Sequence, residues 1–524
     1  MLKFVIVPVL SIVGVLAWQF INWAWVRPKR IERLFRKQGM KGTTYKPLLG
    51  DMKGVDELYK KAFSKPIDFG DDIVPRLMPN ILDTVNKYGN FSFNWMGPRP
   101  RVYITEPSVF REIMVNYRKY KKPFKANNPI AKMLVSKGLA DMEGDEWFKS
   151  RSQLNPAFHT TNLKPLVPKV QVCCENILNE WQKITSAGGG SNVIDVKEHL
   201  DIYTSSVLAQ LMFNSPYTGQ VKETSFKLVE LKSLGRLAVD LLSLPGQKYF
   251  PTKKNIEAHK VNRFIEDSFT SMINERLEKM RRGERDTTSK NRDLLEIFME
   301  DLYNDEQTKG GGNRRKMIDD IIGQCKIFFF GGFDTTSNTI CWTMINLAVY
   351  KDWQNRAREE VMRVIGDKKE ISPDDLSQLK VITMIMNEVL RLYPTIMEIS
   401  RLIVDDSKIG EYMIPKDTLM TYPILLLNRS TELWGNDANE FKPERFADGV
   451  AMATKKYGLG QFMPFGSGPR ICIGQNMSVI ELKVFIALLV RKFSIDLSPS
   501  YKHGPKIDFT IQPQYGAPLI LKEL

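Results

Sequence analysis

Apolar residues recur with a helical period through most of the chain. From about residue 55 onward they return every three to four positions, as on one face of an α-helix. The clearest helical segments span residues 166–185, 255–281 and 482–493. Short strands are expected at residues 101–104, 401–404, 419–423 and 517–521. The pattern therefore predicts a mainly α fold with a minor β-sheet portion.

Two polar stretches interrupt this periodicity. They span residues 283–292 and 304–315, and the second contains Gly310-Gly311-Gly312. Polar and glycine-rich stretches between periodic segments are typical of exposed connections. We expect both to be loops.

The first apolar run is continuous rather than periodic. Residues 4–26 are interrupted only by Pro8, Ser11, Gln19 and Asn22, and about 20 apolar residues suffice for a helix to span a bilayer. A cleaved signal peptide would need a shorter apolar core and a site of small residues, but bulky tryptophans occupy that place. We therefore expect residues 1–26 to be a transmembrane signal anchor.

A basic cluster follows the apolar run. It holds Arg27, Lys29, Arg30, Arg33, Arg36 and Lys37 against the single acidic Glu32. Positive charge beside a span favours the cytosolic side for the rest of the chain. We expect residues 27–54 to be a basic juxtamembrane linker, and residues 55–524 to form one large domain in the cytosol.

The overall charge and the cysteines exclude several classes of site. The net charge is +15, yet no nucleic-acid-binding motif accompanies it, so we expect no nucleic-acid partner. Five cysteines and four histidines are scattered without the spacing of a zinc site or a disulfide framework. The exception is one cysteine in a glycine-rich loop.

Cys472 lies in the stretch Phe465-Gly466-Ser467-Gly468-Pro469-Arg470-Ile471-Cys472-Ile473-Gly474. Glycines let the backbone turn tightly and approach the sulfur, and the amides of a following helix stabilise a thiolate. Arg470 is a planar donor suited to a haem propionate. The alternative is a buried structural cysteine. The pattern favours a thiolate ligand to haem iron.

This loop resembles the haem-binding loop of the cytochrome P-450 superfamily of haem-thiolate monooxygenases. The resemblance implies the cytochrome P-450 fold in one large domain, with haem b (iron protoporphyrin IX) as cofactor. Cys472 is then the axial iron ligand, and Phe465, Gly468 and Gly474 support it.

A second motif lies inside a long apolar helix, at Gly331-Gly332-Phe333-Asp334-Thr335-Thr336. Glycines and β-branched threonines are poor helix formers, so their presence in a buried helix invites a functional explanation. The alternative is a kink that fits a neighbouring helix. In the superfamily this motif activates oxygen; Thr335 matches the oxygen-contacting threonine and Asp334 its acidic neighbour, which implies catalytic roles for both.

Three further residues match positions that contact the haem propionates in the superfamily. Trp147 and Arg151 are four apart and share one helix face, and Arg401 follows in Ser400-Arg401-Leu402. Alone, such a Trp–Arg pair is ordinary packing beside a solvated charge. The resemblance implies that all three hold the cofactor with Arg470.

Glu388 and Arg391 lie three apart on a helix that is apolar nearly all round. In isolation this spacing is usual for a surface pair, but a buried pair needs more partners. Arg445, in Lys442-Pro443-Glu444-Arg445-Phe446, provides one. The superfamily joins these residues in a structural Glu-Arg-Arg triad.

Candidates for the substrate pocket follow from helix geometry and from the resemblance. They are Phe328, Gly331, Gly332, Ile396, Met397, Glu398 and Gln512. Glu398 is unusual, because an apolar residue is expected there. Either it faces the pocket and recognises a hydroxyl or a cation, or it is an outward, solvated carboxylate. The stretches 241–245 and 249–250 are candidates to dip into the membrane.

Stretches along the chain also resemble one plant clan of the superfamily, including Ala447-Asp448-Gly449-Val450 and Leu497-Ser498-Pro499-Ser500-Tyr501. That clan includes secologanin synthase and hydroxylases of brassinosteroids, gibberellins and cytokinins. The resemblance implies a monooxygenase of the endoplasmic reticulum membrane that oxidises an apolar small molecule. Its partners would be membrane lipid and NADPH-cytochrome P-450 reductase.

Two other classes remain open. A haem-thiolate isomerase or dehydratase needs no dioxygen, and such proteins often lose the threonine that Thr335 matches here. A non-enzymatic haem sensor would not need an oxygen-activating helix.

Overall fold

Helices dominate the computed structural model, which describes residues 2–123, 129–235, 251–284, 293–309, 314–455 and 458–524. The longer helices are α1 (Leu2–Ile21), α2 (Arg27–Lys37), α3 (Val55–Ala62), α5 (Pro79–Tyr88), α6 (Pro107–Val115), α7 (Pro129–Val135), α8 (Gly144–Leu154), α10 (Val167–Ala187), α11 (Val196–Phe213), α12 (Gly219–Gly235), α13 (Lys253–Arg281), α14 (Leu294–Lys309), α15 (Arg314–Val349), α16 (Lys351–Val364), α18 (Lys380–Leu392) and α22 (Gln475–Lys492). Shorter helices are α4 (Val74–Leu77), α9 (Thr160–Leu163), α17 (Pro373–Gln378), α19 (Ile424–Asn428), α20 (Thr431–Trp434) and α21 (Val450–Ala453). The predicted mainly α fold is confirmed.

Within the described residues, the strands form one larger sheet and three small ones. The larger sheet has the order β1 (Lys41–Gly42), β2 (Phe91–Met96), β3 (Arg99–Ile104), β9 (Leu419–Tyr422), β6 (Ile399–Ile403) and β4 (Tyr120–Lys121). The others are β10 (Phe493–Leu497) with β13 (Pro518–Glu523) and β5 (Ser191–Asp195), and the pairs β11 (Pro505–Asp508) with β12 (Thr510–Pro513) and β7 (Ser407–Ile409) with β8 (Tyr412–Ile414). All four predicted strands are present, with ends displaced by at most two residues.

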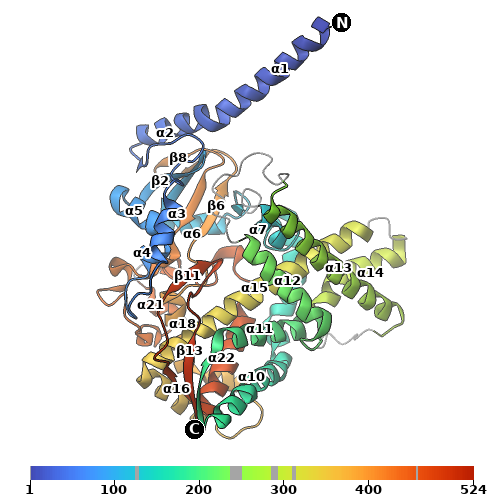
Figure 1. The fold of residues 1–524 in the computed structure, drawn as a ribbon, viewed down its shortest axis with the longest axis vertical. Coiled ribbons are helices and arrows are strands. Elements are labelled where there is room, and N and C mark those ends of the chain that lie inside the picture. Colours follow the sequence, from blue (N-terminus) through green and yellow to red (C-terminus); the bar gives the residue numbers. More distant parts are fainter. Residues whose placement is uncertain (1, 124–128, 236–250, 285–292, 310–313, 456–457) are drawn as a thin grey trace.

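Helix α15 is the centre of the helical part of the molecule. It runs for 36 residues and packs against α11, α14, α18 and α22 (Figure 1). Residues all round this helix are buried, so its sequence lacks a polar stripe. The largest core cluster surrounds it, and a second cluster fills one face of the six-stranded sheet.

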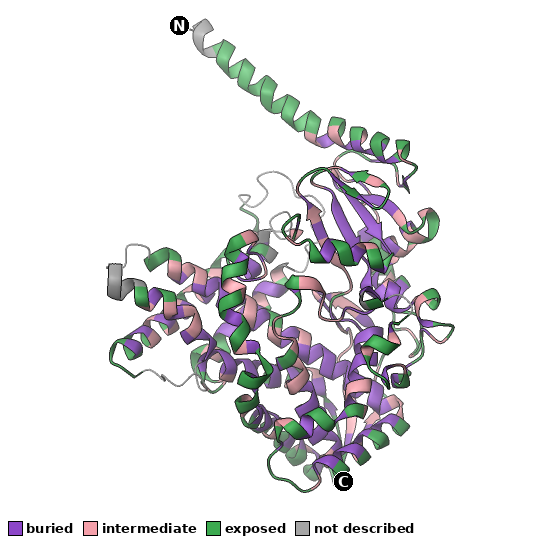
Figure 2. Ribbon diagram, turned by 180° about the vertical axis from the view of Figure 1, so that it is seen from behind, coloured by how far each residue is buried: buried purple, intermediate pink, exposed green. Residues whose placement is uncertain are grey.

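The N-terminal helix stands apart from this core. Figure 1 shows α1 projecting from the domain, and Figure 2 shows it exposed over residues 6–21. Among the described residues one helix, Ile6–Lys37, is long and apolar enough to cross a membrane. The predicted N-terminal span is therefore supported by length and composition, as in a membrane-anchored protein.

Part of the expected linker is an ordered helix. α1 continues through a π-helical turn, Asn22–Val26, into α2, whose Ile31 and Phe35 pack into the sheet cluster. Arg27 also forms an ion pair with Asp417 at 3.0 Å. The apolar face of α2 thus fastens the span to the sheet and leaves basic side chains outside.

One loop prediction is wrong in part. Residues 304–309 continue α14 and residues 314–315 begin α15, so only the glycine-rich centre separates the two helices. A helix can continue through this polar stretch, because helical periodicity needs only one apolar face. Residues 285–292, 310–313 and 241–250 lie outside the described residues.

Candidate active site

The cysteine loop is held by its backbone. The amide of Cys472 donates to the carbonyl of Phe465 at 2.9 Å. Gly468 has φ +69°, and a Cβ there would lie 2.7 Å from the carbonyl oxygen of Met114. Both the backbone angle and the close approach therefore require glycine at this position.

The side chain of Cys472 is exposed to solvent, and protein atoms surround its sulfur on the remaining sides. Burial raises the pKa of the Cys472 thiol, while the amides of Gly474 and Gln475 and the charges of Arg151 and Lys122 act in the opposite direction. The amides belong to the start of α22, as the sequence predicts. This environment suits a thiolate whose charge is shared with a metal ion.

The glycines of α15 differ in their surroundings. A Cβ on Gly331 would meet nothing within 4 Å, whereas one on Gly332 would lie 2.7 Å from Leu208 of α11. Thr335 lies one turn after Gly331 and donates to its carbonyl at 2.7 Å. Gly331 and Thr335 thus line an open space, and Gly332 permits close packing of two helices.

This face of α15 lies against the cysteine loop. The hydroxyls of Thr336 and Ser478 on α22 are 3.2 Å apart, and Phe328 and Ile473 pack on the same apolar cluster around Trp147. Gly331 and Thr335 lie between Phe328 and Thr336 on α15. The structure therefore brings residues 331–336 of α15 next to the cysteine loop.

Asp334 is buried on another side of α15. Its Oδ1 lies 2.6 Å from Nζ of Lys232 on α12, and its Oδ2 accepts from Thr510 on β12 at 2.7 Å. Asn338 also donates to its backbone carbonyl at 2.8 Å. Asp334 therefore joins three elements of the fold.

Basic side chains gather beside the cysteine loop and the Trp147 cluster. The Arg470 guanidinium lies over the Trp147 ring at 4.7 Å from its centroid. Within the described residues, Nη1 of Arg470 and Nε of Arg401 are buried without a hydrogen-bond partner. Two buried guanidinium groups with N–H donors that lack an acceptor fit an anionic ligand. The propionate carboxylates of haem b are such a ligand.

Arg151 is placed differently from Arg470. Its guanidinium donates to the carbonyl of Ile471 at 2.8 Å and to the side chain of Asn155 at 2.7 Å. These contacts tie α8 to the residue before Cys472. In this arrangement Arg151 supports the loop itself.

The predicted Glu-Arg-Arg triad is formed in the structure. Glu388 and Arg391 are fully buried and paired through two hydrogen bonds of 2.7 Å each. Nε of Arg445 lies 3.5 Å from Glu388 Oε1. Arg391 also donates to the carbonyls of Asn428 and Ala438, so the triad binds the backbone of several loops.

The remaining pocket candidates have mixed environments. Ile396 is exposed and Met397 is half-buried against the main core. Glu398 is half-buried and paired with the buried Arg101 of β3, so it is neither free in solvent nor unpaired. Gln512 donates to Asp508 at 3.1 Å across the β11–β12 pair.

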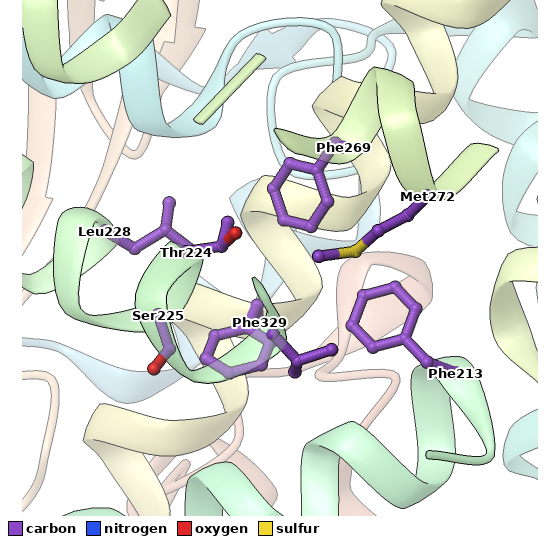
Figure 3. A pocket seen from close by; sticks show the side chains of 8 residues that line it. Phe213, Thr224, Ser225, Leu228, Phe269, Met272 and Phe329 are labelled. Atoms are coloured by element: carbon purple, nitrogen blue, oxygen red, sulfur yellow. The ribbon is translucent and has the colours of Figure 1, made fainter. Parts of the chain in front are cut away.

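A small pocket on another side of α15 is distinct from this site. Figure 3 shows it between Phe213, Leu228, Phe269 and Phe329, with the hydroxyls of Thr224 and Ser225 on its rim. Phe329 is two residues from Gly331, and this spacing turns its side chain away from the open space. The gaps are too narrow for a water molecule, so they are packing space between helices.

Sequence reasoning missed four partner residues of this site: Lys122, Glu143, Lys232 and Arg101. Each comes from a segment far from the motif that it serves. The one available signal was Glu143, which lies four residues before Trp147 at the start of the same helix. The others carry no local pattern.

Comparison with known proteins agrees with this geometry. The cytochrome P450 family model matches residues 77–516. Cytochrome P450 CYP72A219 of Panax ginseng is 40% identical over 517 residues, covering 98% of this chain and 97% of its own length. Secologanin synthase 1 of Catharanthus roseus is 38% identical over 526 residues, covering 100% of this chain and 98% of its own.

A third relative, 7-deoxyloganic acid hydroxylase of Catharanthus roseus, is 40% identical over 512 residues, covering 97% of this chain and 96% of its own length. These relatives are oxidising enzymes, and the family binds haem b. The cysteine loop, the open face of α15, the buried cations and the match over most of its length together show that this chain belongs to the cytochrome P450 family of monooxygenases.

Proposed function

We propose that this protein is a membrane-anchored monooxygenase of plant specialised metabolism. It takes electrons from NADPH through NADPH-cytochrome P-450 reductase and oxidises an apolar terpenoid, steroid or hormone-like molecule. The observation that carries the proposal is the open space beside Gly331, one turn before Thr335, on a helix that contacts α22 next to the cysteine loop. The relatives named secologanin synthase and 7-deoxyloganic acid hydroxylase support a terpenoid-derived substrate.

In this proposal residues 55–524 are the catalytic domain, residues 27–54 join it to the anchor, and residues 1–26 span the membrane of the endoplasmic reticulum. The basic side chains of α2 support a cytosolic position for the domain. The anchor keeps the domain close to a bilayer, in which apolar substrates concentrate.

Haem, when bound, supplies the dioxygen chemistry, and the Cys472 thiolate donates electron density to its iron. Thr335 presents a hydroxyl on the open side, and its proton is available there once it releases the Gly331 carbonyl. Asp334, which lies on another side of α15 and is paired with Lys232, supplies protons to the open side through water. Phe328, Ile396, Met397, Glu398 and Gln512 are the pocket candidates for contact with an apolar substrate.

Two measurements test the proposal. The reduced protein with carbon monoxide should give the absorbance band of thiolate-ligated haem near 450 nm, and Cys472→Ala should lose it. Turnover with NADPH and reductase over a panel of terpenoids and hormones should then yield an oxygenated product, and Thr335→Ala should lower the amount of product formed per NADPH consumed.

Conversion of a hydroperoxide without NADPH, and no NADPH-dependent product, would instead indicate an isomerase or dehydratase. A normal spectrum without any turnover would indicate a sensor.

A further inference from the structure

Three cations and one carboxylate converge beside the cysteine loop. Lys122 follows β4, Arg401 lies on β6, Arg470 precedes Cys472, and Glu143 precedes α8. Oε1 of Glu143 accepts from Nη2 of Arg470 at 2.7 Å and from the backbone amide of Lys122 at 2.9 Å. A single carboxylate oxygen thus ties two of the cationic segments together.

The group carries an excess of positive charge. With Lys122 protonated, the state that a bound anion favours, three cations less one carboxylate leave +2, and the opposite charges of Arg151 and Asp141, which also act on Arg470, cancel. Burial, followed by the charge of Arg470, lowers the pKa of Arg401 to about 10, and Glu143 acts in the opposite direction. Burial together with Arg470 and Arg401 lowers the pKa of Lys122 to about 7. Such mutual repulsion is costly unless an anion joins the group.

Glu143 has no other evident task. It occupies the N-cap position of α8, but its side chain makes no capping hydrogen bond. Its oxygen is turned instead toward Arg470, whose second hydrogen bond goes to the carbonyl of Met142 at 2.8 Å. Asp141 adds a weaker attraction to Arg470. The carboxylate therefore serves the cation group and not the helix end.

We propose that Glu143 is a positioning residue with two effects. Its carboxylate lowers the net charge of this group to +2, which the two propionates of haem b balance. Its hydrogen bond also orients the Arg470 guanidinium toward those propionates. The proposal rests on haem binding and is independent of the substrate. Without Glu143, the surplus positive charge would favour the reduced iron, because reduction adds an electron beside it. The variant would then have a more positive reduction potential.

Charge-changing variants of the full-length holoprotein test this inference. Glu143→Gln keeps an oxygen acceptor and removes the charge, so its potential should shift positively while the 450 nm band stays. Arg401→Gln should shift the potential negatively, and the double variant, again at +2, should return close to wild type. Asp145→Asn is the matched control, because Asp145 lies in the first turn of the same helix and pairs with the exposed Arg118; it should leave the potential unchanged.

The positioning role has a separate readout. Glu143→Ala removes the acceptor as well as the charge and should release haem to apomyoglobin several-fold faster than Glu143→Gln. A Glu143→Gln potential equal to wild type, or an equal shift in Asp145→Asn, would overturn the charge role. If Glu143→Gln retains no haem, the reduction potential of Glu143→Asp is measured instead. This variant keeps the negative charge, so its potential should equal that of wild type. A different potential would contradict the charge role. Neither measurement involves substrate or reductase, so the proposed function is tested independently.

Discussion

At the scale of single residues, two adjacent glycines of α15 have different reasons to be glycine. Gly332 lies against Leu208, whereas Gly331 faces open space. Gly332→Ala should destabilise the protein by about 1–3 kcal/mol, because the new methyl group overpacks two helices. Gly331→Ala should leave stability unchanged or raise it by up to about 1 kcal/mol, since alanine is the better helix former.

Thermal unfolding of the two holoprotein variants measures this difference, and each serves as the control for the other. Gly331→Ala should also change the position or rate of substrate oxidation, because its methyl group enters the proposed substrate space. Equal destabilisation by both changes would mean that the space beside Gly331 is closed in solution.

Glu398 has two possible roles, a structural ion pair with Arg101 and a direct contact with the substrate. Its partner Arg101 is buried and also donates to Thr421 at 3.0 Å. Glu398→Gln should lower stability by about 1–3 kcal/mol, because it leaves the Arg101 charge poorly compensated. Urea unfolding checks this result. Unchanged stability together with altered substrate preference would favour a direct contact between Glu398 and the substrate.

At the scale of elements, the Lys232–Asp334 pair joins α12 to α15. Both side chains are at least 95% buried. Lys232→Met should destabilise the protein by about 3–5 kcal/mol, because Asp334 is left as a buried carboxylate without its cation. Adding Asp334→Asn should recover part of that loss, since the double variant has no uncompensated charge.

A double-mutant cycle on the four proteins, measured by denaturant unfolding, gives the coupling energy of this pair. Lys227→Met is the matched control, because Lys227 lies on the same helix and pairs with Glu230 near the surface. That change should cost less than about 1 kcal/mol. A double variant as unstable as the sum of the singles would contradict a direct pair.

The sequence predicts the helices, the strands and the motifs better than the residues from distant segments that contact those motifs. The span 166–185 nearly coincides with α10, because periodicity reports the buried face directly. The periodic segment 482–493 begins seven residues after the start of α22, since the cysteine loop and not the apolar pattern sets that start. Lys232 was not predicted either, because its role follows from the packing of α12 on α15, which leaves no local pattern.

At the scale of the whole molecule, segments near both ends of the chain are fastened to the domain. α2 packs on the sheet near one end, while His503 lies close to the other. The His503 ring is within 5.8 Å of Trp342 on α15 and 4.9 Å of Phe69, centroid to centroid. Its Nδ1 lies 2.9 Å from the hydroxyl of Tyr501. His503 therefore joins the C-terminal segment to the N-terminal part of the domain.

This position makes global stability depend on pH. Burial, with the charges of Arg429 and Arg76, lowers the pKa of His503 from its ordinary value near 6.5 to about 4. The contribution of the neutral His503 ring to the free energy of unfolding is fully present above pH 6.5. As the pH falls toward 4, the unfolded chain binds a proton that the folded chain excludes, and at pH 5 this lowers the free energy of unfolding by about 2 kcal/mol.

His503→Phe keeps the aromatic contacts and cannot titrate, so its stability should fall less between pH 7 and pH 5. Denaturant unfolding at both pH values measures the difference, and His259→Phe, a change on the exposed side of α13, should behave like wild type. Equal acid sensitivity of the His503→Phe variant and wild type would show that other groups govern the acid unfolding of this protein.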